Sequence, residues 1–149
     1  MTIQAKAQLI INKPINDVFN AIIDPTRLCQ YFTSTVSAPL TEGASVTWTW
    51  KDANAEFIID VQKIESNKRI VFKWPATGTD SIVDIILEPL DENSTLIRVI
   101  ETGWKLNMQG VEYTNQQTGG WMHMFLCLKA YLEYSINLRN GSLCKQSMN

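Results

Sequence analysis

The stretch of sequence from Gly120 to Gly141 reads GWMHMFLCLKAYLEYSINLRNG. Its apolar residues recur every three or four positions, which is the spacing of one face of an α-helix. This apolar stripe comprises Trp121, Met124, Phe125, Leu128, Tyr131, Leu132 and Ile136. Arg139 in the last turn and Gly141 just beyond it are typical of helix C-termini. The sequence therefore predicts a long helix that ends near Arg139 and needs an apolar surface to cover its stripe.

Two positions are candidate starts for this helix. Thr114 and Gln117 have the spacing of a capping box, in which each side chain bonds a free backbone N–H group. Thr118 is the alternative start, because Gly119 and Gly120 would weaken the interior of a helix. The residues themselves leave both starts open.

The middle of the chain follows a period of two. Val46, Trp48 and Trp50 alternate with polar residues, which indicates a half-buried strand. Short polar turns separate the segments that follow, and such turns indicate antiparallel hairpins. The predicted strands are 45–51, Glu56–Ile64, Arg69–Trp74, Ser81–Leu87 and Thr95–Glu101, and an irregular bridge is expected over Gly103–Gly110.

The N-terminal part predicts one strand and two short helices. Ala5–Asn12 alternates as a strand does, and Pro14 suits the first position of a helix because its missing N–H is not needed there. Asp24 can cap a second helix that begins at Pro25 and ends near Phe32.

Length and composition describe an ordinary globular chain. The 149 residues are 45% hydrophobic and 19% charged, and this length is typical of one domain. We expect a single domain over residues 1–149 with a flexible tail at 142–149. The formal net charge of −2 provides no attraction to nucleic acid, and no apolar run is long enough to span a bilayer.

The cysteines and the N-terminus indicate the compartment. Cys29, Cys127 and Cys144 are odd in number and widely separated, without a CxxC pair. A reducing compartment explains this pattern better than a disulfide framework. The N-terminus also lacks the basic and then apolar pattern of a secretory signal. The sequence therefore predicts a cytoplasmic protein, with Cys29 and Cys127 as small core residues and Cys144 in the polar tail.

The order of the predicted elements indicates an α+β protein. The sheet needs a cover for its apolar face, and the terminal helix is the predicted element with enough length and a wide enough stripe. A twisted sheet of about seven strands curls around such a helix instead of lying flat against it. We therefore expect a curved antiparallel sheet that grips the long C-terminal helix, with an apolar pocket between them.

Three segments resemble parts of SRPBCC (START-like) domains: the opening, the penultimate strand and the terminal helix. These segments are Pro14–Ala21 with Asp24-Pro25, Thr95–Trp104, and Gly120-Trp121 with Leu128-Lys129, Leu132-Glu133 and Gly141. The terminal helix is similar to that of one branch, the homologues of the activator of the heat-shock-protein-ninety ATPase. The resemblance implies the helix-grip fold of the birch pollen allergen class, with a hydrophobic cavity under the long helix.

Aromatic residues are the main candidates for pocket walls. Each of the five tryptophans can bury about 150–250 Å², so these side chains either fill the core or line a ligand pocket. The predicted pocket residues are Trp48, Trp50, Phe57, Ile59, Phe72, Trp74, Val99, Glu101, Trp104, Trp121, Phe125 and Leu128.

Glu101 and His123 are the candidate catalytic residues. If Ile97 and Val99 face the helix, the period of two places Glu101 on the same side, either at the pocket mouth or as a solvated residue past the rim. His123 and Cys127 share a helical face at a spacing that can hold a metal, but two ligands fall short of a zinc site. A partly buried or surface histidine is the alternative for His123.

Three functions are compatible with these residues. The first is a binding module for a small apolar molecule, such as a lipid or a polyketide-like aromatic compound. The second is a cofactor-free cyclase, hydratase or hydrolase that uses Glu101. The third, which the resemblance implies, is a stimulator of a chaperone ATPase. No P-loop, dinucleotide fingerprint or HExxH motif is present, so we expect no standard cofactor and no metal. We expect a monomer or a homodimer.

Overall fold

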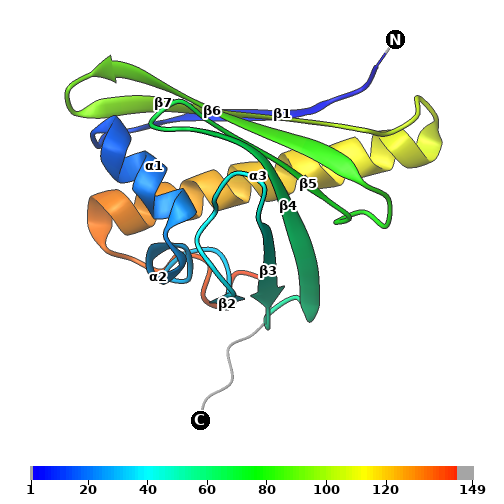
Figure 1. The fold of residues 1–149 in the computed structure, drawn as a ribbon, viewed down its shortest axis with the longest axis horizontal. Helices are drawn as coiled ribbons and strands as arrows, with labels where there is room; N and C mark the ends of the chain where they lie inside the picture. The colour runs from blue at the N-terminus through cyan, green and yellow to red at the C-terminus, as the bar shows by residue number, and fades with distance from the viewer. Residues whose placement is uncertain (1, 144–149) are drawn as a thin grey trace.

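The computed structural model describes residues 2–143 and shows one curved sheet around one long helix (Figure 1). The seven strands form a single sheet in the order β1-β7-β6-β5-β4-β3-β2, and every neighbouring pair is antiparallel. The strands are β1 (Ala5–Ile11), β2 (Thr35–Val36), β3 (Ser45–Trp50), β4 (Ala55–Glu65), β5 (Arg69–Trp74), β6 (Ser81–Asp91) and β7 (Ser94–Thr102). The helices are α1 (Ile15–Ile23), α2 (Pro25–Leu28) and α3 (Met108–Tyr134). The predicted α+β helix-grip fold is confirmed.

Cys144 and most of the predicted flexible tail lie outside the described residues. Within residues 2–143, no helix combines the length and the hydropathy needed to cross a bilayer.

Most strands lie where the period of two predicts them. β5 has the predicted bounds, and β6 and β7 extend the predicted hairpin up to the turn at Glu92 and Asn93. The short strand β2 is the exception, because two residues contain no periodic pattern. It is defined by its pairing with β3, in which Val36 lies opposite Trp48.

The junction between α1 and α2 follows the predicted capping. The side chain of Asp24 accepts a hydrogen bond from the N–H of Thr26 at 2.9 Å, and Pro25 occupies the first position of α2. α2 ends at Leu28, earlier than the predicted Phe32, because the chain continues in turns. Phe32 is nevertheless buried, as the apolar pattern predicts.

The predicted start of the long helix is wrong. α3 begins at Met108 because the side chain of Asn107 accepts a hydrogen bond from the N–H of Gly110 at 2.8 Å and so caps the helix. Thr114 and Thr118, the predicted starts, both lie inside α3. The irregular bridge after β7 is correspondingly shorter than predicted.

The predicted end of the helix is also wrong. α3 stops at Tyr134, and Ser135 caps it in the left-handed conformation with φ of 56°. Arg139 and Gly141 therefore lie beyond the helix, and Ile136 is 53% exposed instead of belonging to the buried stripe. In Figure 1 the segment after α3 runs toward β2 and β3.

The apolar stripe of α3 closes the concave face of the sheet. Trp121, Met124, Phe125 and Leu128 are buried there together with the inward residues of the strands. Cys127 is fully buried, as predicted. Cys29 is only partly buried, and its thiol lies 3.4 Å from the hydroxyl of Thr33.

Lys129 and Glu133 connect α3 to the edge strand β1. Because the two residues are four positions apart on a helix, their spacing predicts an exposed ion pair. In the structure the two charges lie 2.6 Å apart, but the Glu133 side chain is only 9% exposed. Lys129 also donates to the carbonyl of Ile10 at 2.8 Å, and the N–H of Asn12 donates to Glu133 at 3.0 Å. Burial alone would raise the pKa of Glu133, but the hydrogen bonds from Lys129 and Asn12 outweigh it and lower that pKa.

Candidate functional site

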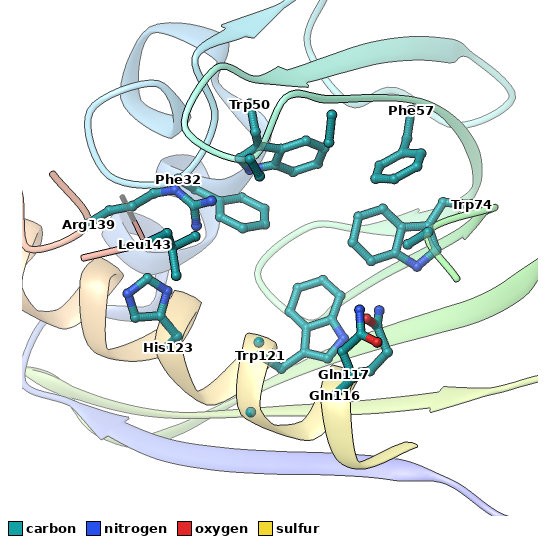
Figure 2. A pocket seen from close by; sticks show the side chains of 15 residues that line it. Phe32, Trp50, Phe57, Trp74, Gln116, Gln117, Trp121, His123, Arg139 and Leu143 are labelled. Carbon is teal, nitrogen blue, oxygen red and sulfur yellow. The ribbon is translucent and has the colours of Figure 1, made fainter. Parts of the chain in front are cut away.

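A cavity of about 500 Å³ lies between α3 and the strands β3, β4 and β5. Five aromatic side chains line it, and Figure 2 shows them around one common space: Phe32, Trp50, Phe57, Trp74 and Trp121. The ring centroids of Phe32 and Trp50 are 5.3 Å apart, those of Phe57 and Trp74 are 5.9 Å apart, and those of Trp74 and Trp121 are 5.5 Å apart. These are favourable distances for aromatic pairs, so the rings support one another as a wall.

Glu101 lies behind this wall and is fully buried. It pairs with Val83 in the sheet and shares the inward face of β7 with Ile97 and Val99, as the period of two predicts. Glu101 is neither at the pocket mouth nor solvated past the rim. Both predicted positions are wrong because side chains of β5, β6 and α3 enclose the carboxylate of Glu101.

Four uncharged donors surround the Glu101 carboxylate. Its Oε1 accepts from the indole Nε1–H of Trp121 at 2.7 Å and from the amide of Gln117 at 3.0 Å. Its Oε2 accepts from the indole Nε1–H of Trp74 at 2.8 Å and from the hydroxyl of Ser81 at 2.6 Å. A buried carboxylate is costly unless it is hydrogen-bonded in this way. The same bonds fix the orientation of two indole rings in the cavity wall.

The helix side of the cavity is formed partly by Gly119 and Gly120. Glycine in a helix interior costs about 1 kcal/mol relative to alanine. A Cβ atom built at either position would meet no other atom within 4 Å. Close packing therefore does not require these glycines, and any larger side chain would extend into open space beside or inside the cavity.

Arg139 closes one end of the cavity. Its guanidinium donates to both carboxylate oxygens of Asp52, at 2.8 and 3.1 Å, and lies 5.6 Å from the centroid of the Phe32 ring. This contact joins the segment after α3 to the turn between β3 and β4. Phe32 and Arg139 also line a smaller neighbouring hollow of about 260 Å³.

His123 lies at the same end of the cavity as Arg139 (Figure 2). Burial lowers the pKa of His123, and the charge of Arg139 lowers it further. The Sγ of Cys127 is 3.6 Å from Nε2 of His123, and burial raises the pKa of that thiol, which disfavours the thiolate needed for metal binding. Among residues 2–143, no group of three His, Cys, Asp or Glu side chains could hold a metal ion.

The structure brings part of the predicted pocket together. The predicted residues that line the cavity are Trp50, Phe57, Trp74 and Trp121, and the catalytic candidate His123 lines it as well. The predicted residues that do not line it are Trp48, Ile59, Phe72, Val99, Glu101, Trp104, Phe125 and Leu128. Most of these side chains are buried in the hydrophobic core instead. Trp104 instead donates from its indole to the hydroxyl of Thr77 at 2.9 Å, outside the cavity.

Other lining residues are not predicted from the sequence: Phe32, Gln117, Gly119, Gly120 and Arg139. The adjacent glycines carry the clearest signal. Two glycines inside an otherwise helical pattern indicate either a helix boundary or a place where the helix must leave space. In the structure both glycines lie inside α3, where they line the cavity.

A curved antiparallel sheet that grips a long helix beside an apolar cavity defines the helix-grip class of START-like domains. The chain belongs to the family described as activator of Hsp90 ATPase homolog 1-like protein, whose family model matches residues 12–133. No curated protein matches the chain.

Several solved structures share the fold. Protein SSP2350 from Staphylococcus saprophyticus is 26% identical, with a TM-score of 0.79 over 92% of this chain and 96% of that one. DynU16, a protein in the dynemicin biosynthetic locus, is also 26% identical, with a TM-score of 0.79 over 90% of this chain but 48% of its own. The Aha1 dimer from Colwellia psychrerythraea is 16% identical, with a TM-score of 0.76 over 89% of this chain and 97% of that one, and this likeness concerns the fold alone.

Proposed function

We propose that this protein binds a flat apolar small molecule in the cavity between α3 and the sheet. The observation that carries the proposal is the open space opposite Gly119 and Gly120, which faces the rings of Trp50, Trp74 and Trp121. Ligand sites are typically concave, aromatic-lined and about 300–1,000 Å³ in volume. The cavity of about 500 Å³ is within that range.

Two features indicate that the cavity is a binding site and not a defect in the packing of the core. Two glycines of α3 line the cavity, although alanine would stabilise the helix. The Cβ atom of an alanine would have no atom within 4 Å at either position. The indoles of Trp74 and Trp121 are held by hydrogen bonds to Glu101, so the wall exists before a ligand arrives. A preformed wall reduces the entropy that binding must overcome.

One structural relative supports a role with small molecules. DynU16 is a protein in a biosynthetic locus, and it is 26% identical to this chain. Because this chain spans 48% of DynU16, the comparison bears on the shared domain.

Tryptophan fluorescence tests the proposal, since three cavity residues are tryptophans. The protein should be titrated with fatty acids, sterols and polycyclic aromatic compounds, and the aromatic compounds should give saturable changes. The blocking variant is Gly120→Leu, which places a side chain where no atom lies within 4 Å. The matched control is Asn115→Leu, which adds the same side chain to an exposed position of α3 outside the cavity.

We expect Gly120→Leu to abolish the response and Asn115→Leu to preserve it. Binding that survives in Gly120→Leu would mean that the ligand occupies another surface. The absence of any saturable response from the unmodified protein across the three ligand classes would contradict the proposal.

The family supports a second candidate function, stimulation of the Hsp90 ATPase. It is measured as the rate of ATP hydrolysis by Hsp90 with and without this protein. A contact made by the outer surface should be insensitive to Gly120→Leu, whereas a ligand-dependent activity should be lost with it. An unchanged rate of ATP hydrolysis would remove this candidate.

A further inference from the structure

We infer that the cavity selects ligands carrying a hydrogen-bond donor, such as the hydroxyl of a hydroxylated aromatic molecule, and that the carbonyl of Gln117 accepts this bond. The inference rests on the proposed binding function and adds the chemical class of the ligand. Apolar pockets usually contain a few polar groups that orient the ligand. Gln117 is such a group, because it lies beside Trp74 and Trp121 at one end of the cavity (Figure 2).

Glu101 determines which end of the Gln117 amide faces the cavity. The Nε2 of Gln117 donates to both oxygens of the carboxylate, at 3.0 and 3.3 Å. The opposite orientation would place the amide oxygen next to the two carboxylate oxygens. All three atoms are hydrogen-bond acceptors, so no bond could form between them. The amide nitrogen is therefore committed to Glu101, and the Oε1 of Gln117 is directed away from the carboxylate. Since Gln117 also lines the cavity, that oxygen is the polar atom it offers to a ligand.

The Gln117 carbonyl is available for a ligand. Among residues 2–143, no group donates a hydrogen bond to its Oε1. The buried polar atoms without a partner do not include this oxygen, so it is not buried. The carbonyl is therefore both free and accessible.

The carboxylate also strengthens this acceptor. An amide whose N–H donates to an anion is polarised, and its carbonyl becomes a better acceptor. A ligand that presents a donor gains this bond. A ligand that presents only an acceptor or a methyl group there displaces water from the carbonyl and gives it no hydrogen bond in return. This unpaired carbonyl lowers the affinity for such ligands and so favours those that carry a donor.

The neighbouring glutamine in the same turn of α3 lacks this fixed orientation. Gln116 also lines the cavity but is exposed. None of its side-chain atoms is bonded to Glu101, whose amide partner is Gln117. Glu101 therefore does not fix the orientation of the Gln116 amide.

Calorimetric titration with three related compounds tests the inference. Naphthol carries a hydroxyl donor, its methyl ether keeps the oxygen but lacks the donor, and methylnaphthalene replaces the hydroxyl with a methyl group of similar size. We expect the unmodified protein to bind naphthol about tenfold more tightly than either analogue. The preference should disappear in Gln117→Leu and persist in Asn115→Leu, at an exposed position of α3 outside the cavity.

The outcomes separate the inference from the function on which it rests. Equal affinities for the three compounds in the unmodified protein would overturn the role of Gln117 and leave apolar binding intact. A preference for naphthol that persists in Gln117→Leu would do the same. If none of the compounds binds, the proposed function fails together with the inference. Should Gln117→Leu not fold, Gln117→Met, which also lacks the amide, replaces it, and a naphthol preference that persists in Gln117→Met would overturn the role of Gln117.

Discussion

The indole N–H of Trp121 donates a hydrogen bond of 2.7 Å to the Oε1 of Glu101, and both side chains are buried. This bond joins α3 to the end of β7 by a directional contact, in addition to apolar packing. Trp74 makes the corresponding bond from β5 to Oε2, at 2.8 Å. One carboxylate therefore sets the positions of a helix and two strands around the cavity.

The first prediction concerns this carboxylate. Glu101→Gln should lower the free energy of unfolding by about 3 kcal/mol. The substitution replaces one carboxylate oxygen, an acceptor, with an NH₂ group, a donor that cannot accept the hydrogen bonds made to that oxygen. Urea denaturation measures the loss, and the tryptophan emission of the folded variant should also change. Glu56→Gln, on the exposed part of β4, should stay within about 0.5 kcal/mol of the unmodified protein.

The same variant examines the enzyme hypothesis. If Glu101 positions the wall, its replacement changes stability and ligand affinity together. A variant that keeps its full stability and loses only turnover of a substrate would show that Glu101 acts in chemistry instead.

The second prediction compares two glycines of α3. Gly120→Ala should stabilise the protein by about 1 kcal/mol, since alanine is the better helix residue and its Cβ meets nothing within 4 Å. Gly110→Ala should be strongly destabilising, because a Cβ there would lie 1.9 Å from the carbonyl oxygen of Lys105. Thermal denaturation of both variants shows whether each substitution raises or lowers the stability. Loss of stability in Gly120→Ala would mean that the glycine serves packing and not the cavity.

The third prediction concerns the contact that holds the C-terminal segment. Asp52→Asn removes the charged partner of Arg139, whose side chain is 12% exposed, and should cost about 1–2 kcal/mol of stability. Because Arg139 lines the cavity, ligand dissociation measured by stopped flow should become faster. Glu88→Gln removes an exposed pair with Arg98 at 3.7 Å and should change neither quantity. Equal dissociation rates for the two variants would show that the contact between Asp52 and Arg139 does not retain the ligand.

The fourth prediction is a pH dependence. The pKa of Glu133 is below its ordinary value of 4.5 in the folded protein, so the unfolded chain takes up this proton first as the pH falls. The stability contributed by Glu133 is therefore fully present above about pH 4.5 and is lost as the pH falls through the lowered pKa. Glu133→Gln should make unfolding less dependent on pH in acid. Glu112→Gln, at an exposed position of α3, should leave the acid dependence unchanged.

The sequence predicts the sheet well because alternation is a local signal. Val46, Trp48 and Trp50 are all buried on one face of β3, as their spacing indicates. The ends of α3 are less predictable because they depend on single capping residues. Asn107 and Ser135 perform this role, whereas Thr114, Arg139 and Gly141 have suitable chemistry in the wrong places.

The cavity is predicted only in part for a different reason. Period and apolar character identify which side chains face inward, but not which of them pack together and which border empty space. Trp48 and Trp50 share one face of β3, yet only Trp50 lines the cavity. The contribution of Arg139 depends on Asp52, which is far from it in the sequence, so no local pattern reveals it.

The most direct test follows the indole N–H signals of the five tryptophans by NMR while naphthol is added. A ligand in the cavity should move the signals of Trp50, Trp74 and Trp121, which line it. The signal of Trp104, which is bonded to Thr77 outside the cavity, should stay in place. Shifts confined to Trp104, or no shift of the three cavity indoles at saturating naphthol, would contradict binding between the helix and the sheet.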